Sequence, residues 1–370
     1  MDPIKILKRS WQILWSYRAL WVFGLILALA GAGSSGGGGN TGYQFNGNDQ
    51  PQFTQDWHPE DLPQSLQEAL DEIRILFNEG AHMTGISQQE LNTLIWLVVA
   101  AVIFFFVLGI LMAIARYVAE TATMRMVDEY EASGAKMTVR QGFRIGWSPT
   151  SWRLFLINLI VNLPMILLMA VLLTVGVAIF RMVTSGNETA LTAGIISLIG
   201  VVFLSIFVAI ILSTILGLLR HFFWRACALE GLGVRDSLMR GFAVVRENWK
   251  SVGLMWLVMI GLGIVWALVS ILIVLVTLPI VAMTFILGLV VASIPTLLLV
   301  GLFSLFLGGP LPWIVAILFV LPLFFTLAFS PWLLLGAWQT VFTSSVWTLT
   351  WRELKAIPDT ESPQVEPAKD

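Results

Sequence analysis

The chain has 370 residues, of which 57% are hydrophobic and only 12% charged, and its formal net charge is −2. Soluble domains carry roughly 25% charged residues, so this composition excludes an ordinary soluble protein. No charged side chain occurs from Ser251 to Gly309, a run that would reach roughly 85 Å as a helix, nearly three bilayer thicknesses. The sequence therefore predicts an integral membrane protein of the all-α class, built as a polytopic helical bundle.

Residues 1–32 begin with basic and aromatic side chains and continue into an apolar run. This pattern predicts an interfacial helix that leads into a first membrane span at about 18–33. A basic start followed by an apolar run is also typical of a signal peptide, and the small residues after Gly31 would suit cleavage. We favour a retained span because the entry to the run is rich in aromatic residues.

Residues 33–90 form the one sizeable water-facing segment, in which Arg74 is the only basic residue. Apolar residues between Pro59 and Phe77 recur at three- and four-residue spacing, which predicts an amphipathic helix that caps the bundle or lies on the membrane surface. Because Lys and Arg stay in the cytoplasm during insertion, this segment is expected on the opposite, extracytoplasmic side.

Residues 91–355 are expected to form the membrane bundle, followed by a disordered tail at 356–370. The fifth span is expected to end before Pro279. Residues 280–309 then form either a re-entrant hairpin or two further crossings, which gives six or eight crossings in total; we favour six. The predicted spans after the first are about 91–115, 153–180, 190–219, 251–278 and 313–338.

A short pattern occurs three times, at residues 6–15, 138–147 and 237–246. Each copy has an apolar residue, one or two basic residues, a small residue and then an aromatic residue, and a membrane span follows it. The pattern predicts three parallel repeats, each an interfacial helix followed by a pair of membrane helices. The expected apolar faces comprise Leu7, Trp11, Leu14 and Trp15 in the first copy, and Leu238, Gly241, Phe242, Val245 and Trp249 in the third.

Two groups of polar residues are candidates for binding. Asn158 and Asn162 lie one turn apart in the third span, before Pro164, and are expected to hydrogen-bond between helices or to line a polar substrate site. The basic group either anchors the cytoplasmic ends of the helices or contacts a lipid headgroup or a protein partner. It comprises Lys8, Arg9, Arg140, Arg144, Arg220, Arg240 and Arg246.

Other chemistry receives little support from the sequence. Cys227 is the only cysteine, so it forms no disulfide within the chain and is expected to be a buried thiol. His58 and His82 are isolated, and no metal ion, cofactor or nucleic acid is expected. Asp128, Glu129 and Glu131 form an acidic patch that is expected to be solvated or to pair with Arg125 or Lys136 nearby in the sequence.

The stretch from Ala226 to Phe242, together with Arg246 to Trp249, resembles a linker of bacterial multi-pass proteins related to the membrane domain of glycerophosphoryl diester phosphodiesterases. The closing run from Ser345 to Leu354 resembles the end of those domains. The resemblance implies a multi-pass protein of the bacterial cytoplasmic membrane, and the basic clusters place both termini in the cytoplasm. Catalysis in those enzymes belongs to a separate soluble barrel, so the resemblance implies no catalytic residue here.

These features favour a membrane-organising or scaffold protein that contacts lipids, or a protein partner, through cytoplasmic helices or through the 33–90 segment. A transporter or permease for a lipid-like or amphipathic substrate is the alternative, and a lipid-modifying membrane enzyme is the third possibility. We disfavour the enzyme because no catalytic constellation is found. The predicted spans have no Asp, Glu, Lys or His near their middle, which argues against proton-coupled transport.

Overall fold

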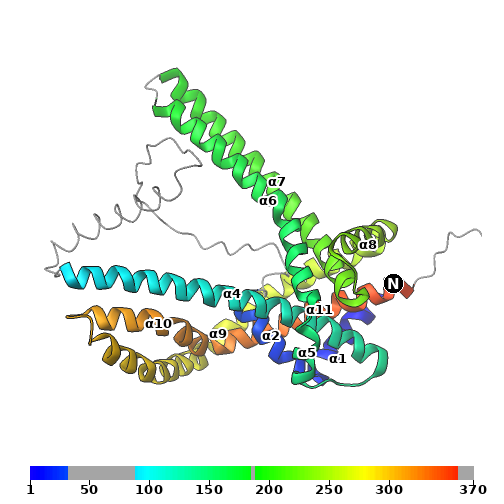
Figure 1. The fold of residues 1–370 in the computed structure, drawn as a ribbon. Helices are drawn as coiled ribbons and strands as arrows, with labels where there is room; N and C mark the ends of the chain where they lie inside the picture. Colours follow the sequence, from blue (N-terminus) through cyan, green and yellow to red (C-terminus); the bar gives the residue numbers. More distant parts are fainter. Residues whose placement is uncertain (32–87, 185–187, 357–370) are drawn as a thin grey trace, which may run out of the picture. The chain divides into compact units, whose positions relative to one another are not determined.

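The computed structural model describes residues 1–31, 88–184 and 188–356 (Figure 1). These residues form ten helices and no strand, so the predicted all-α class is confirmed. The predicted 33–90 segment lies almost wholly outside the described residues, and so does the tail from residue 357 onward. The helices are α1 (Pro3–Ser16), α2 (Ala19–Leu29), α4 (Gln88–Ser133), α5 (Val139–Gly146), α6 (Pro149–Thr184), α7 (Glu188–Glu230), α8 (Val234–Glu247), α9 (Trp249–Phe303), α10 (Leu311–Ala328) and α11 (Ser330–Ala356).

Five of these helices, α4, α6, α7, α9 and α10, are long and apolar enough to cross a membrane. They direct large apolar side chains outwards: Leu173 on α6 is 67% exposed and Phe203 on α7 is 75% exposed. Apolar surface of this extent is unfavourable in water, whereas hydrocarbon accommodates it. The chain is therefore an integral membrane protein.

The first predicted span, at about 18–33, is represented by α2, which has only 11 residues and reaches roughly 16 Å, about half of the hydrocarbon thickness. A bend of 99° separates α2 from α1, and the two count as one candidate span only when they are taken together. The buried Tyr17 fixes this bend. Its hydroxyl donates to the carbonyl of Met137 at 3.0 Å and accepts from the N–H of Met137 at 2.7 Å.

The chain divides into two compact units. The helices α4 and α9 each contribute residues to both units. Unit 1 comprises Met1–Asn40, Ala113–Leu275 and Trp332–Asp370, and unit 2 comprises Thr41–Met112 and Val276–Pro331.

Unit 2 contains a hairpin between the second half of α9 and α10 (Figure 1). The expected end of the fifth span before Pro279 is wrong, because α9 continues through Pro279 and Pro295 to Phe303. A proline removes one backbone donor, but an unwound segment in hydrocarbon would leave several backbone groups without partners, so continuing the helix costs less. The arms of the hairpin are joined by Thr284, whose hydroxyl donates to the carbonyl of Ala328 at 2.8 Å.

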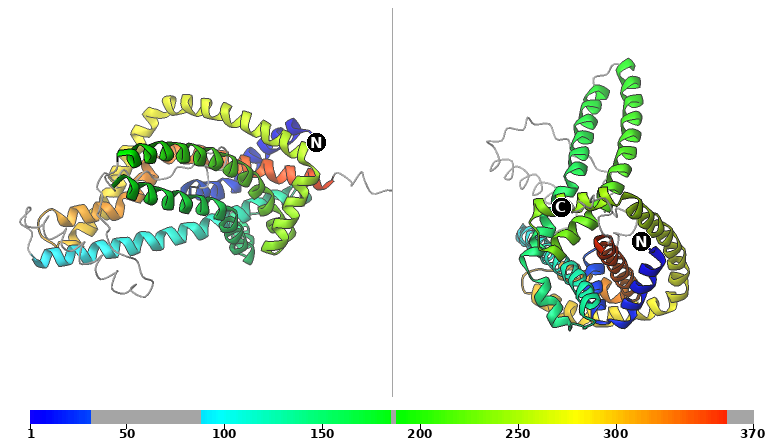
Figure 2. Two further views of the ribbon diagram at one scale, coloured as in Figure 1. Left: turned by 90° about the horizontal axis from the view of Figure 1, so that it is seen from above. Right: turned by 90° about the vertical axis from the view of Figure 1, so that its right-hand side faces the viewer.

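Unit 1 has its core around α11. Buried side chains from α1, α2, α4 and α7 pack together with α11, among them Ile13, Phe23, Met126, Phe222 and Trp351. Four buried hydroxyls of α11 donate to the carbonyl one turn earlier: those of Thr340, Ser345, Thr348 and Thr350. The buried hydroxyl of Ser344 has no such partner among the described residues. Within the same unit α6 and α7 form an antiparallel hairpin (Figures 1 and 2). Cys227 is fully buried, as predicted.

Short helices cover all three copies of the sequence pattern: α1, α5 and α8. The small residue of each copy, Ser10, Gly142 or Gly241, is buried. A Cβ atom added to Gly142 would lie 2.6 Å from the ring of Phe23, and one added to Gly241 would lie 3.0 Å from the backbone nitrogen of Phe223. The small residue therefore lets each short helix approach its neighbour closely.

We expect Gly241→Ala to destabilise the protein because the backbone of α7 lies against this position and cannot move aside as a flexible side chain would. Overpacking of this kind costs about 1–3 kcal/mol. The control is Gly253→Ala in α9, where an added Cβ atom meets nothing within 4 Å. The midpoint of thermal unfolding in detergent should be lower for Gly241→Ala than for Gly253→Ala or the wild type. Equal midpoints would contradict the close approach of α8 to α7.

Candidate functional site

In the short helices, the face that is buried in the protein overlaps the predicted apolar face only in part, at Leu14 in the first copy and at Gly241 in the third. In α8 the buried residues are Ser237, Gly241 and Val244, whereas Phe242 and Trp249 are 53% and 66% exposed. The face with the small residue packs most closely against the neighbouring helix, and this turns the adjacent aromatic face outwards. The same holds for α1, which buries Ile6, Ser10, Ile13 and Leu14.

Aromatic and basic side chains consequently lie together on the outside of all three helices. The exposed aromatic residues are Trp11 and Trp15 on α1, Phe143 on α5 with Trp147 directly after it, and Phe242 on α8 with Trp249 at the start of α9. The exposed basic residues are Lys8 and Arg9 on α1, Arg140 and Arg144 on α5, and Arg240 and Arg246 on α8. We call these twelve residues the collar. Of the predicted basic group, only Arg220 lies elsewhere, on α7.

Two collar arginines also face carboxylates of neighbouring helices. Arg9 Nε donates to Glu131 Oε1 at 2.8 Å, and Arg240 Nε lies 3.7 Å from Glu230 Oε2. Within the acidic patch, Glu131 pairs with Arg9 and not with Arg125 or Lys136, whereas Glu129 is exposed, as expected for a solvated face.

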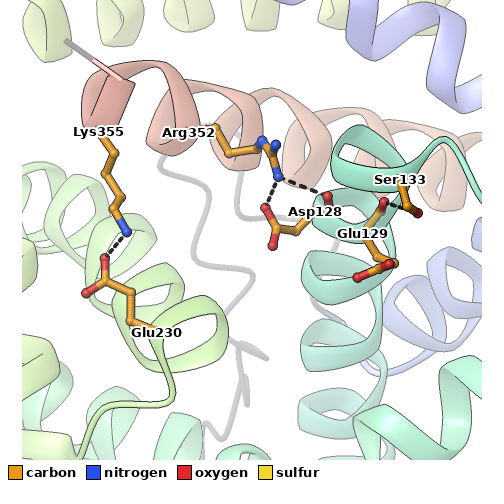
Figure 3. Close-up of polar contacts among 6 residues, drawn as sticks. All are labelled: Asp128, Glu129, Ser133, Glu230, Arg352 and Lys355. Carbon is orange, nitrogen blue, oxygen red and sulfur yellow. Dashed lines mark hydrogen bonds and ion pairs between the residues drawn. The ribbon is translucent and has the colours of Figure 1, made fainter.

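The C-terminal end of α11 forms the remaining partners of this acidic region (Figure 3). Arg352 Nη1 donates to the carboxylate of Asp128 and, at 2.9 Å, to the carbonyl of the same residue. Lys355 Nζ lies 2.9 Å from Glu230 Oε1. These ion pairs tie the end of α11 to α4 on one side and to α7 on the other.

Arg125 on α4 joins three further elements of unit 1. Its Nε donates to the carbonyl of Ala228 at 2.9 Å, near the end of α7, and its Nη1 donates to the carbonyl of Ile145 at 3.1 Å, at the end of α5. Its Nη2 donates to the hydroxyl of Thr150 at 2.8 Å, in the first turn of α6. A single guanidinium therefore satisfies acceptors at the termini of three helices.

The first candidate asparagine, Asn158, belongs to a polar cluster between α4, α6 and α7. Its Nδ2 donates to the hydroxyl of Tyr117 at 3.0 Å, and its Oδ1 accepts from Arg220 Nη1 at 3.4 Å. Asn158 therefore forms hydrogen bonds to both neighbouring helices. Asn162 lies outside this arrangement and donates to the carbonyl of Asn158 at 2.8 Å, within its own helix.

Two members of this cluster, Glu120 and Trp224, were not identified from the sequence, and Arg116 and Arg225 were recognised only as basic residues beside the spans. Arg116 and Glu120 follow the second span as it was predicted, one helical turn apart, and their i,i+4 spacing was the signal that could have identified them. The rings of Tyr117 and Trp224 lie with their centroids 6.4 Å apart, with Arg116 over the first ring and Arg220 over the second. Glu120 follows Arg116 by one turn of α4, and Arg225 follows Trp224 on α7. We call the set Arg116, Tyr117, Glu120, Asn158, Arg220, Trp224 and Arg225 the arginine cluster.

An apolar cavity of about 130 Å³ lies beside the collar in unit 1. Aromatic side chains from α1, α9 and α11 line it, among them Trp15, Trp266 and Trp338. Trp15 contacts Trp338 with ring centroids 5.4 Å apart. The shape and lining of this cavity suit an apolar chain next to a headgroup.

We expect Arg125→Lys to destabilise the protein although it keeps the charge, because an ammonium cannot reach three separate acceptors as the guanidinium fork does. The loss of charge-assisted hydrogen bonds to buried acceptors should cost about 3 kcal/mol. The matched control is Arg140→Lys on the exposed surface of α5, which should change stability by less than about 0.5 kcal/mol. Chemical or thermal unfolding of both variants in detergent tests this; equal stability would rule out a structural role for the fork.

Comparison with known proteins places the chain in a family without linking it to an activity. No curated protein and no solved structure matches the chain. A family model does match, over residues 7–344, and its description is a family of unknown function (DUF7544). Nothing in this match links the chain to the membrane domains of glycerophosphoryl diester phosphodiesterases. Because the match covers most of the 370 residues, the chain belongs to this family, DUF7544, and is an integral membrane protein within it.

Proposed function

We propose that the protein is a membrane-organising scaffold that recruits anionic lipids through the collar. The observation that carries this proposal is that α1, α5 and α8 each bury a small residue and expose aromatic rings beside basic side chains. Aromatic rings favour the interface between headgroups and hydrocarbon, and basic side chains attract anionic headgroups by about 1 kcal/mol each. Both groups therefore favour the same position, at the level of the lipid phosphates.

The distribution of basic residues also supports an orientation. The collar and the basic end of α11 belong to the same unit, and Arg9, Arg240, Arg352 and Lys355 are joined to α4 or α7 by ion pairs. By the positive-inside rule this region, with both termini, faces the cytoplasm. The three repeats, each a short helix followed by membrane helices, would then lie parallel to one another in a bacterial cytoplasmic membrane.

A permease for a lipid-like substrate is the second candidate. The apolar cavity lined by Trp15, Trp266 and Trp338 favours it, because that cavity could receive an acyl chain whose headgroup contacts the collar. A permease would move a labelled lipid across a proteoliposome membrane, whereas a scaffold would only retain it. The resemblance to phosphodiesterase membrane domains identifies no catalytic residue, so it gives no support to an enzymatic function.

The lipid proposal predicts that replacing four arginines by glutamine, at positions 140, 144, 240 and 246, weakens the preference for anionic lipid. At about 1 kcal/mol per residue the preference should fall on the order of a hundredfold or more. The measurement is native mass spectrometry of protein extracted from membranes with equal amounts of phosphatidylglycerol and phosphatidylcholine, which counts the retained lipids of each kind.

The matched control replaces the same four residues by lysine, which keeps the positive charge and should keep the preference for phosphatidylglycerol. If the glutamine variant is inserted and folded but retains phosphatidylglycerol as the wild type does, the collar does not recruit anionic lipid. If both variants lose the preference for phosphatidylglycerol, the collar recognises the lipid through contacts that lysine cannot replace.

The orientation proposal predicts that Arg144→Cys and Arg240→Cys, each combined with Cys227→Ala, are labelled from the same side of the membrane. Both positions are exposed, whereas the native thiol is buried. A membrane-impermeant maleimide should label neither variant in intact cells and both in inverted vesicles. Labelling of one position from each side would disprove the parallel repeats.

A further inference from the structure

The arginine cluster lies where three uncharged runs meet the first charged residues. Arg116 ends the uncharged run of α4, Arg220 ends that of α7, and Asn158 follows the start of the run in α6 that begins after Arg153. Positions of this kind lie at the boundary between hydrocarbon and headgroups. The cluster is therefore at a depth that both lipid phosphates and small anions from the aqueous phase can reach.

The charges of the cluster are not balanced by the protein. The cluster contains three guanidiniums and only one carboxylate, that of Glu120, which is 8% exposed. Arg116 and Arg220 are brought near each other by the rings over which they lie, since the centroids of Tyr117 and Trp224 are 6.4 Å apart. Buried positive charge in excess is costly, and proteins compensate it with a counter-charge.

The cluster also has too many hydrogen-bond donors. The Nε groups of Arg116, Arg220 and Arg225 and the indole N–H of Trp224 are buried and meet no acceptor within the described part of the chain. Trp224 itself is only 4% exposed. Buried donors are almost always paired in folded proteins, so four orphan donors in one cluster indicate a missing acceptor.

The members of the cluster have different roles. Arg225 is fixed by the protein, since its Nη1 donates to the carbonyl of His221 at 2.7 Å and its Nη2 to that of Ser344 at 3.0 Å. Arg220 lies over the ring of Trp224 at 5.2 Å, and Arg116 lies over the ring of Tyr117 at 6.0 Å. These rings hold the two guanidiniums by cation–π contact and leave their edges for a ligand.

We propose that Arg116 and Arg220, with Tyr117 and Trp224, bind a phosphate group. Two guanidiniums match the oxygens of a phosphate by paired hydrogen bonds, and the group supplies the charge and the acceptors that the cluster lacks. The hydroxyl of Tyr117 accepts from Asn158, which leaves its own hydrogen for the ligand. The phosphate belongs either to an anionic phospholipid or to a soluble phosphate compound.

This site is distinct from the collar and does not depend on the collar's function. None of its residues lies on α1, α5 or α8. The collar variant with four glutamines should therefore keep full phosphate binding, and the two proposals can fail separately.

The test uses the full chain, delipidated in dodecyl maltoside, which carries no phosphate. One arm adds inorganic phosphate and compares it with chloride at equal ionic strength; the other adds short-chain phosphatidic acid and compares it with a short-chain diacylglycerol. The readout is the rise in the unfolding midpoint as ligand is added, because a ligand that binds only the folded state stabilises it. Arg116→Gln and Arg220→Gln should each weaken binding by about tenfold or more.

The control is Arg235→Gln, which removes an exposed positive charge from α8 and should leave binding unchanged.

Stabilisation by phosphate and lipid alike, or by phosphate alone, supports a soluble ligand, and stabilisation by lipid alone supports a headgroup. Absence of any shift in the wild type overturns the proposal. So does a shift that Arg116→Gln and Arg220→Gln leave intact, since the arginines would then be structural. If a glutamine variant does not fold, Arg116→Lys, which keeps the charge but loses the fork, should bind several-fold more weakly than the wild type; equal binding would overturn the site.

Discussion

The described part of unit 1 depends on the pairing of backbone acceptors at helix ends with arginine side chains. Arg125 reaches the end of α5, the end of α7 and the start of α6 from one position on α4. Helices that leave a membrane expose unpaired carbonyls at a depth where water is scarce, and a guanidinium supplies several donors at once. With these ends fixed, α5, α6 and α7 take up one arrangement, and the collar and the arginine cluster are positioned as a result.

The basic residues of the chain fall into two classes that their sequence neighbours do not distinguish. Arg140 and Arg144 lie on the exposed side of a short helix, beside aromatic rings, and suit a fluid lipid surface. Arg116 and Arg220 lie over the rings of Tyr117 and Trp224 and suit one bound anion. The first class would give a broad preference for anionic lipid and the second a discrete site, so one protein could both gather lipids and select one.

Several features of the fold and of the site were predictable from single segments. The uncharged runs indicated the membrane helices, and the repeated pattern indicated α1, α5 and α8 together with their small residues. Asn158 was identified as a polar contact between helices, and its bonds to Tyr117 and Arg220 bear this out. Pro279 was misread as a helix end, because the rule that prolines end helices applies in water and weakens where unwinding leaves backbone groups unpaired.

The sequence by itself determined that this chain enters a membrane, that it belongs to the all-α class, and that Cys227 is buried. These properties follow from local sums of hydropathy and from spacing within one helix. Only the tertiary structure decided which face of each short helix is buried, that Asp128 pairs with Arg352, and that Asn158 joins Tyr117 to Arg220. Those outcomes depend on partners far apart in the chain, since Asp128 and Arg352 are separated by 224 residues. A pattern along the sequence does not show which distant charges will lie together in a low-dielectric environment.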